Sequence, residues 1–306
     1  MFFRNLTLFR FSTAAAEALA DGLARRLKKH VARPCGPLEL STRGWVAPLG
    51  RGEAALEFEL GDFVWLTLGG EDKILPPATV NAAVAERVDK LEAERGKPPG
   101  GRERKRLKEE VLNELLPRAL ARPIRVNGYC DRKTGWAVVD TPSAKQGEAF
   151  VSHIRATVES FPAVPLDPGE SPKAVLTDWL AGGKMPEGWA LGDECELKDP
   201  GGRGAVVRAR RLDLDSGEVR EHLKTGKQAS QLGLVVEERM SFTIDENLVI
   251  RKLRFLEAAT ESLEESERDS AVSESQARFA LMSMSLRPLL ATLADTFKLA
   301  RPRERH

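Results

Sequence analysis

The sequence predicts an α+β protein in which antiparallel sheets are combined with separate helices. Short runs rich in Val, Phe and Leu are typical of strands, and glycine, proline or aspartate turns separate most of them. Longer segments carry apolar residues three or four positions apart, which is typical of helices. Strands and helices do not alternate with the rhythm of a parallel α/β fold, which favours the α+β class.

Composition limits the classes of protein that remain. The chain has 306 residues, of which 42% are apolar and 30% charged, with a formal net charge of +1. No apolar run approaches the roughly 20 residues of a membrane helix, and Arg4 and Arg10 interrupt the apolar start as they would not in a signal peptide. Three widely spaced cysteines favour a reducing compartment. We therefore expect a cytoplasmic protein without membrane contact, cofactor or metal.

The first 77 residues predict a strand, a helix and a strand-rich segment. Residues 2–11 alternate as a strand, Ser12 or Thr13 caps a helix that reaches His30, and strands follow at 43–49, 54–60 and 62–69.

Positions 78–117 predict a helical hairpin. Pro77 opens the first helix, and "GKPPGG" at 96–101 must end it because proline and glycine break helices. The second helix has Leu107, Val111 and Leu115 on one face and ends at Pro117. The segment 101–125 holds eight basic and four acidic residues, whereas 257–275 holds seven acidic residues and one basic residue. This asymmetry fits either a polyanion-binding surface or two solvated helix faces.

The remaining sequence predicts further strands and helices. Strands are expected at 123–130, 136–140, 163–166, 194–199 and 205–214, with two or three more in 229–255; helices are expected at 143–160, 171–183, 215–227 and 271–299.

One enzymatic hypothesis arises from "ECELKD". Glu194, Glu196 and Lys198, with Asp178 or Asp193 upstream, match the acid-x-Lys pattern with which many nucleases hold Mg²⁺ and position water. Such a short pattern is common by chance in a chain this rich in charge. The hypothesis also requires a surrounding parallel sheet, which the pattern of elements does not predict.

Binding features are denser than catalytic ones. Alternation puts Arg208 and Arg210 on one strand face, with Val207, Ala209 and Arg211 on the other. The same rule puts Lys252 and Arg254 on the face of Ile250, opposite Arg251. Arginines on strands suit phosphate contacts, and no motif that reads base edges accompanies them, so binding without sequence preference is expected. The alternatives are cross-strand pairing with Glu or Asp, or a basic face that docks an acidic protein.

The chain resembles the RdgC family of bacterial recombination-associated proteins from end to end. The resemblance rests on "RNLTLFR" (4–10), "EDKILP" (71–76), "LLPRA" (115–119), "VVDTPSAK" (138–145), "VPL" (164–166), "LTDWL" (176–180), "DECELK" (193–198), "VVRARRLDL" (206–214) and "RKLRF" (251–255). It implies a non-enzymatic, elongated subunit that forms a ring-shaped homodimer with a basic central hole. It further implies nonspecific binding of single- and double-stranded DNA, association with the nucleoid and restraint of RecA-dependent recombination.

The resemblance also implies a division of the chain and a set of contacts. Residues 1–77 and 120–167 would form a central α+β part, 78–119 a protruding hairpin tip, and 168–306 a β-rich base with a C-terminal helix. The candidate DNA contacts are Lys97, Arg102, Arg104, Lys105, Arg118, Arg208, Arg210, Arg211, Lys252 and Arg254, and the candidate dimer contacts are Leu116 and Leu120. Leu120 stands where the family pattern has Phe, and Leu212 where it has Gln, which weakens the tip contact and removes one polar DNA contact.

Overall fold

The computed structural model describes residues 2–20, 22–50, 52–201, 204–264 and 270–302, and for 262–264 it describes the backbone alone. It confirms the α+β class, with a large antiparallel sheet and nine α-helices within these residues. No helix in the described ranges is long and apolar enough to cross a membrane. The chain divides into two compact units: a larger unit of Met1–Arg26, Ala47–Leu66 and Val126–His306, and a smaller unit of Leu27–Val46 and Thr67–Arg125.

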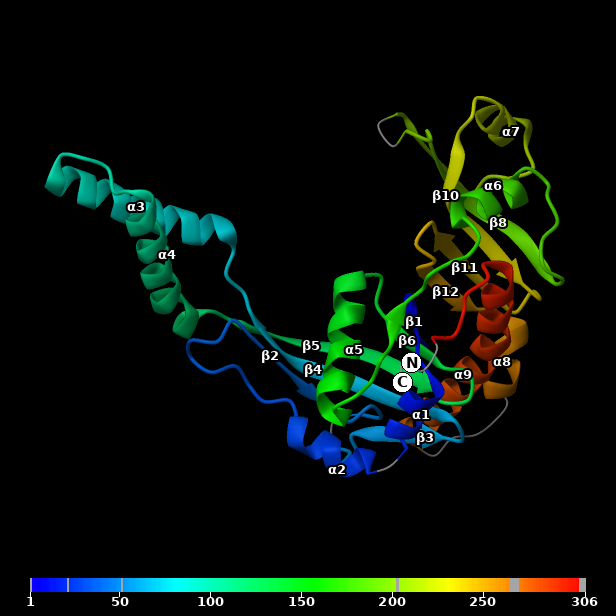
Figure 1. Cartoon of the computed structure of the whole chain (residues 1–306), viewed down its shortest axis with the longest axis horizontal. Helices are drawn as coiled ribbons and strands as arrows, with labels where there is room; N and C mark the ends of the chain where they lie inside the picture. The colour runs from blue at the N-terminus through cyan, green and yellow to red at the C-terminus, as the bar shows by residue number, and fades with distance from the viewer. Residues whose placement is uncertain (1, 21, 51, 202–203, 265–269, 303–306) are drawn as a thin grey trace. The chain divides into compact units, whose positions relative to one another are not determined.

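The larger unit contains most of the sheet (Figure 1). Its strands are β1 (Leu6–Arg10), β3 (Glu57–Leu60), the first part of β4 (Phe63–Lys73), the second part of β5 (Ala121–Asp131), β6 (Trp136–Asp140), β7 (Val164–Pro165), β8 (Trp189–Lys198), β9 (Val206–Arg210), β10 (Gln228–Val236), β11 (Met240–Asp245) and β12 (Ile250–Phe255). Neighbours follow the order β5–β6–β1–β12–β11–β10–β8–β9, with β7 beside β1 and β3 beside β4. Every pairing described between these strands is antiparallel.

Several helices of the larger unit start at a capping serine. They are α1 (Thr13–Ala18), α2 (Leu23–Leu27, whose last residue lies in the smaller unit), α5 (Ala144–Val158), α6 (Pro172–Leu180), α7 (Gly217–Lys224), α8 (Glu257–Glu264) and α9 (Ala271–Thr296). Ser143 and Ser171 each accept a hydrogen bond from a backbone amide three residues on, which satisfies an otherwise unpaired helix donor. Helix α9 contributes Phe279, Leu286 and Leu290 to the core, so it covers the apolar residues of the sheet.

One predicted helix is divided in the structure, and one helix was not predicted. The single helix expected from Ser12 or Thr13 to His30 is α1, α2 and the 3₁₀ helix η1 (Lys28–His30), because Gly22 has a φ of 61°, which a right-handed helix cannot contain. Helix α8 was not predicted in the acidic stretch 257–275, whose residues 265–269 lie outside the described ranges.

The smaller unit contains β2 (Ser41–Trp45), the second part of β4, the first part of β5 and the helices α3 (Pro77–Arg95) and α4 (Gly101–Leu115), followed by the 3₁₀ helix η2 (Leu116–Arg118). Strand β2 pairs with β4 from Ser41 opposite Asp72 to Trp45 opposite Leu68. Helix α3 ends at Gly96, whose φ of 69° suits glycine at a helix end. Helices α3 and α4 lie side by side (Figure 1), and an ion pair of 2.6 Å joins Arg95 to Glu103.

Candidate nucleic-acid interface

Strand β9 presents arginines to solvent, as its alternating sequence predicts. Arg208 and Arg210 are exposed, whereas Val207 and Ala209 pack against the apolar core. Arg211 follows the last residue of the strand with a φ of 53°, so its backbone is left-handed and the alternation ends there. The prediction that Arg211 points to the face of Val207 and Ala209 is therefore wrong, because its exposed side chain lines the same cavity as Arg210.

Strand β12 differs from its prediction because it contains a bulge. Lys252 has a φ of 55°, and the register of β11 against β12 shifts between Ser241 and Thr243. The extra residue makes Leu253, and not Lys252, share the buried side with Ile250. Lys252 and Arg254 are consequently both exposed, and the prediction that they share the face of Ile250 is wrong.

Four of the predicted basic residues surround one cavity of the larger unit. Arg210, Arg211, Lys252 and Arg254 line a cavity of about 600 Å³, together with residues of β8, β10 and β11. These residues come from β9, from its end and from β12, which are not neighbours in the sheet. The structure thus brings together cations that are more than 40 residues apart in sequence, in an arrangement suited to an anion.

Backbone, rather than side chains, forms part of the cavity wall. Gly192 on β8 and Gly233 on β10 both line it. A Cβ atom on Gly192 would lie 2.9 Å from the carbonyl carbon of Gly233, so a side chain would not fit without a shift. The register of β8 against β10 also shifts there, since Cys195 opposes Leu232 and Leu191 opposes Leu234. Such a bulge bends a strand, which leaves room beneath the cations.

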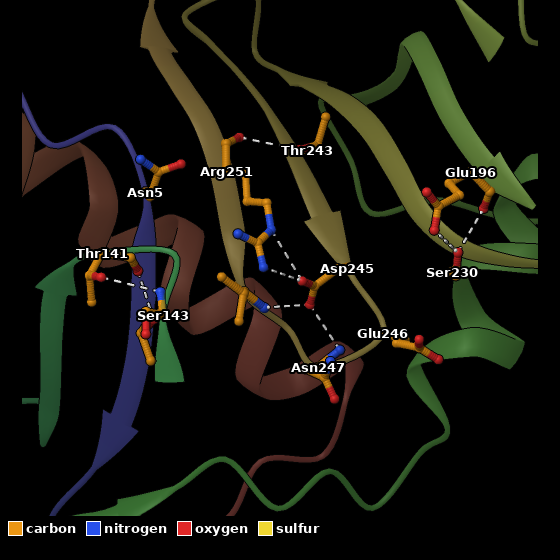
Figure 2. A network of polar contacts seen from close by, with 12 residues as sticks. Asn5, Thr141, Ser143, Glu196, Ser230, Thr243, Asp245, Glu246, Asn247 and Arg251 are labelled. Atoms are coloured by element: carbon orange, nitrogen blue, oxygen red, sulfur yellow. Dashed lines mark hydrogen bonds and ion pairs between the residues drawn. The ribbon is translucent and has the colours of Figure 1, made fainter. Parts of the chain in front are cut away.

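Two glutamates of β8 neutralise part of this basic surface. Lys252 donates from Nζ to the carboxylate of Glu194, and Arg208 donates from Nε to Oε2 of Glu196 at 2.6 Å. Oε1 of Glu196 lies 3.0 Å from Nζ of Lys198 and accepts a hydrogen bond from Ser230 at 3.0 Å (Figure 2). The hydrogen bond from Arg208, with those from Lys198 and Ser230, lowers the pKa of Glu196 to about 2 although burial opposes this.

The other cations of the cavity keep their charge available. Within the described residues, Arg210, Arg211 and Arg254 form no ion pair with a carboxylate. Arg251, by contrast, donates from Nη2 to Oδ2 of Asp245 at 3.1 Å (Figure 2). Asp245 also accepts the backbone amide of Asn247 at 2.9 Å, so it ties Arg251 to the turn before β12.

The residues of the nuclease hypothesis take part in ion pairs on β8. Glu194 and Glu196 are each engaged by a cation, and Lys198 lies 3.6 Å from Glu246 as well as 3.0 Å from Glu196. Strand β8 is flanked by antiparallel β9 and β10, so it lacks the parallel surroundings that the hypothesis requires. No group of three or more His, Cys, Asp or Glu side chains within the described ranges is placed to hold a metal ion.

The smaller unit carries a second set of exposed bases. Lys97 lies between α3 and α4, Arg102 and Lys105 lie on the first turns of α4, and Arg118 lies on η2; all four are exposed and form no ion pair with the residues described. Arg104 is exposed and donates from Nε to the carbonyl oxygen of Pro99 at 3.2 Å, which leaves its charge unneutralised.

The two predicted dimer-contact residues differ in exposure. Leu116 is 4% exposed, so its side chain contributes to the packing of its own chain. Leu120 is 77% exposed, and its carbonyl oxygen accepts the backbone amide of Ile74 at 2.8 Å. Lys73, which precedes Ile74, donates its backbone amide to the carbonyl oxygen of Leu40 at 2.8 Å. Leu40, Ile74 and Leu120, all exposed, therefore lie on adjacent backbone segments of the smaller unit, and we call these three residues the apolar row.

Sequence reasoning missed the glycines of the cavity and two members of the apolar row. Gly233 lies in a segment that was predicted to form strands, and Gly192 lies in the part of β8 that precedes the predicted strand 194–199. A glycine inside a strand can signal a bulge. Leu40 had no sequence signal, because only its backbone hydrogen bond with Lys73 brings its segment beside that of Ile74.

Comparisons with known proteins show the family of the chain. The family model described as "Putative exonuclease, RdgC" matches residues 1–300. The chain belongs to the RdgC family. It is 47% identical over 302 residues to the recombination-associated protein RdgC of Xanthomonas campestris pv. campestris (strain B100), with 98% of this chain and 99% of the relative covered. The proteins of the same name from Xanthomonas axonopodis pv. citri (strain 306) and Stenotrophomonas maltophilia (strain R551-3) are 46% and 44% identical, with the same shares covered.

Proposed function

We propose that this protein acts in homologous recombination by binding single- and double-stranded DNA without sequence preference. The observation that carries the proposal is the set of Arg210, Arg211, Lys252 and Arg254 around one cavity. Arginine and lysine side chains contact phosphate oxygens in this way, and such contacts fix a protein on DNA without reading its bases. The names of the curated relatives support the role in recombination.

The proposal includes a ring-shaped homodimer that associates with the nucleoid and restrains RecA-dependent strand exchange. The apolar row supports a contact between subunits, because Leu120 holds a large apolar side chain 77% exposed. The exposed bases Lys97, Arg102, Arg104, Lys105 and Arg118 would form a second DNA-contacting surface, on the smaller unit. A ring would surround duplex DNA and so impede the exchange of strands.

A titration of the protein with DNA at several salt concentrations tests the proposed DNA binding. If about four to eight phosphates are neutralised, the logarithm of the binding constant should fall against the logarithm of salt with a slope of roughly −4 to −7. Two duplexes of unrelated random sequence should bind equally, and EDTA should change nothing. A flat salt response, or a strong preference for one sequence, would contradict the proposal.

Two further assays test the activity and the assembly. The family description names an exonuclease. We propose a non-enzymatic function because the carboxylates of Glu196 and Glu194 are engaged in ion pairs with Arg208 and Lys252. Incubation of the protein with Mg²⁺ and either labelled linear DNA or plasmid should leave both DNAs intact. Shortened or nicked products would establish a nuclease. The mass in gel filtration should be that of a dimer, and added protein should slow RecA-driven strand exchange.

A further inference from the structure

The glutamates of β8 are set more deeply than the cations that they hold. The side chains of Glu194 and Glu196 are 19% and 17% exposed, whereas those of Lys252 and Arg208 are 49% and 65% exposed. Between the two glutamates, Cys195 is buried and holds the strand on the core. The two carboxylates are therefore less accessible to solvent than the basic groups that they hold.

The two partnerships come from different strands: β9, which pairs with β8, and β12, which does not. Glu196 lies opposite Arg208 in the register of β8 with β9, and their side chains form the 2.6 Å pair. Glu194 lies opposite Arg210 in the same register, yet its carboxylate accepts from Lys252 of β12. The bulge at Lys252 makes this contact possible, because it turns the side chain to the exposed side of the sheet.

We propose that Glu194 and Glu196 limit the affinity of this surface for DNA, because phosphate must displace them from Lys252 and Arg208. The inference depends on the proposed DNA binding and adds a regulation of the same site. A phosphate near a paired cation also meets the carboxylate's negative charge, so the pair attracts it less than a lone cation does. The complex with DNA then dissociates readily, which suits a protein that leaves DNA or moves along it.

The cavity supplies an internal comparison. Arg254 lines the same cavity as Lys252 but forms no ion pair with a described carboxylate. Removal of Arg254 should therefore weaken DNA binding more than removal of Lys252. Removal of Lys252 should become costly only after Glu194 has lost its charge, which is a coupling between two contacting residues.

The test measures binding of a 30-base-pair duplex of random sequence by fluorescence anisotropy at several salt concentrations. Glu194→Gln and Glu196→Gln should each tighten binding roughly two- to fivefold, the equivalent of one partly exposed ion pair. Each should steepen the salt slope by about one, since one more phosphate is neutralised. Glu218→Gln, which removes the same charge from an exposed position of α7, is the control and should leave affinity unchanged.

A double-mutant cycle separates this role from mere positioning of the cation. Lys252→Gln should weaken binding less than twofold in the wild type and several-fold in Glu194→Gln. Equal losses in both backgrounds, or weaker binding by Glu194→Gln itself, would overturn the inference. If a Gln variant fails to fold, the comparison of Lys252→Gln with Arg254→Gln decides: equal losses refute it. Absence of DNA binding by the wild type would instead refute the proposed function.

Discussion

Arg287 of α9 grips the carboxylate of Asp131 at the end of β5 with two hydrogen bonds. Its Nε donates to Oδ2 at 2.8 Å and its Nη2 donates to Oδ1 at 2.9 Å. The side chain of Asp131 is 3% exposed, and it also accepts the backbone amides of Lys133 and Thr134. The hydrogen bond with Asp131 raises the pKa of Arg287, with burial acting in the opposite direction.

Arg287→Met should destabilise the protein by about 3–5 kcal/mol, because it leaves a buried carboxylate without its cation. Urea unfolding followed by circular dichroism measures the free energy of unfolding. Arg278→Ala on the same helix is the control: its 2.5 Å pair with Glu274 is about 40% exposed on both sides, so less than about 1 kcal/mol is expected. Equal losses in the two variants would show that Asp131 does not need Arg287.

The three cysteines should differ sharply in reactivity. Cys130 and Cys195 are 0% and 5% exposed, and burial raises the pKa of both thiols, that of Cys195 to about 11. Cys35 is half-buried, in the smaller unit. Because the thiolate is the reactive form, an Ellman titration at pH 8 should find one fast thiol in the native protein and three after unfolding. Cys35→Ser should abolish the fast phase; a remaining fast thiol would mean that a buried cysteine opens readily.

Elements with strong local signals could be predicted, and elements set by pairing could not. Proline at the start and glycine at the end of α3, and the Ser171-Pro172 start of α6, correspond to the predicted helices. The strand after Pro200 was predicted to continue to residue 214, but β9 ends at Arg210 because Arg211 adopts left-handed backbone. No alternation rule contains the bulge at Lys252.

The basic residues of the candidate site could be predicted from the sequence, but the cavity that they share could not. The sequence identified Arg210, Lys252 and Arg254, because arginines on strands stand out from apolar neighbours. Their common cavity depends on the order of β8 to β12 in the sheet and on the bulge of β8 at Gly192. The pairing of Glu194 with Lys252 depends on the same register, so it could not be read from positions 58 residues apart.

The bases on α4 should contribute to DNA binding without supporting the fold. Arg102, Arg104 and Lys105 are exposed and form no ion pair within the described chain. Their joint replacement by Ala should weaken DNA binding and flatten the salt slope by up to about three. The melting temperature should stay nearly unchanged, since exposed positions contribute little to stability.

A charge-matched control decides whether position matters. Arg25, Lys28 and Lys29 are also exposed, and their joint replacement by Ala removes the same three charges. We expect this variant to bind DNA almost as the wild type does. If both triple variants lose the same affinity, net charge and not the α4 surface governs binding. If the α4 variant binds normally at physiological salt, these bases are only a solvated helix face.

Leu120 should belong to a contact between subunits and not to the DNA surface. Its exposed side chain continues the apolar row of Leu40 and Ile74 in the smaller unit, and such a row is costly unless a partner covers it. In the proposed ring, two subunits meet at two separate contacts, and Leu120 would belong to one of them. Leu120→Asp should therefore keep a dimer through the second contact and lose stable retention on circular duplex DNA. Leu120→Phe should bury more apolar area and so stabilise the contact by about 1 kcal/mol. Dissociation from the circle should then slow about fivefold.

Dissociation from circular and linear duplexes of equal length distinguishes a gate, the subunit contact at which the proposed ring opens, from a simple DNA contact. A change at a gate alters dissociation from the circle alone, because a ring leaves linear DNA over its ends. Met284→Asp is the control, since Met284 is 61% exposed on α9 in the larger unit and should change neither rate. Loss of affinity for both forms in Leu120→Asp would make Leu120 part of the DNA surface. Unchanged rates on both would remove Leu120 from any gate and leave the apolar row without the partner that we assign to it.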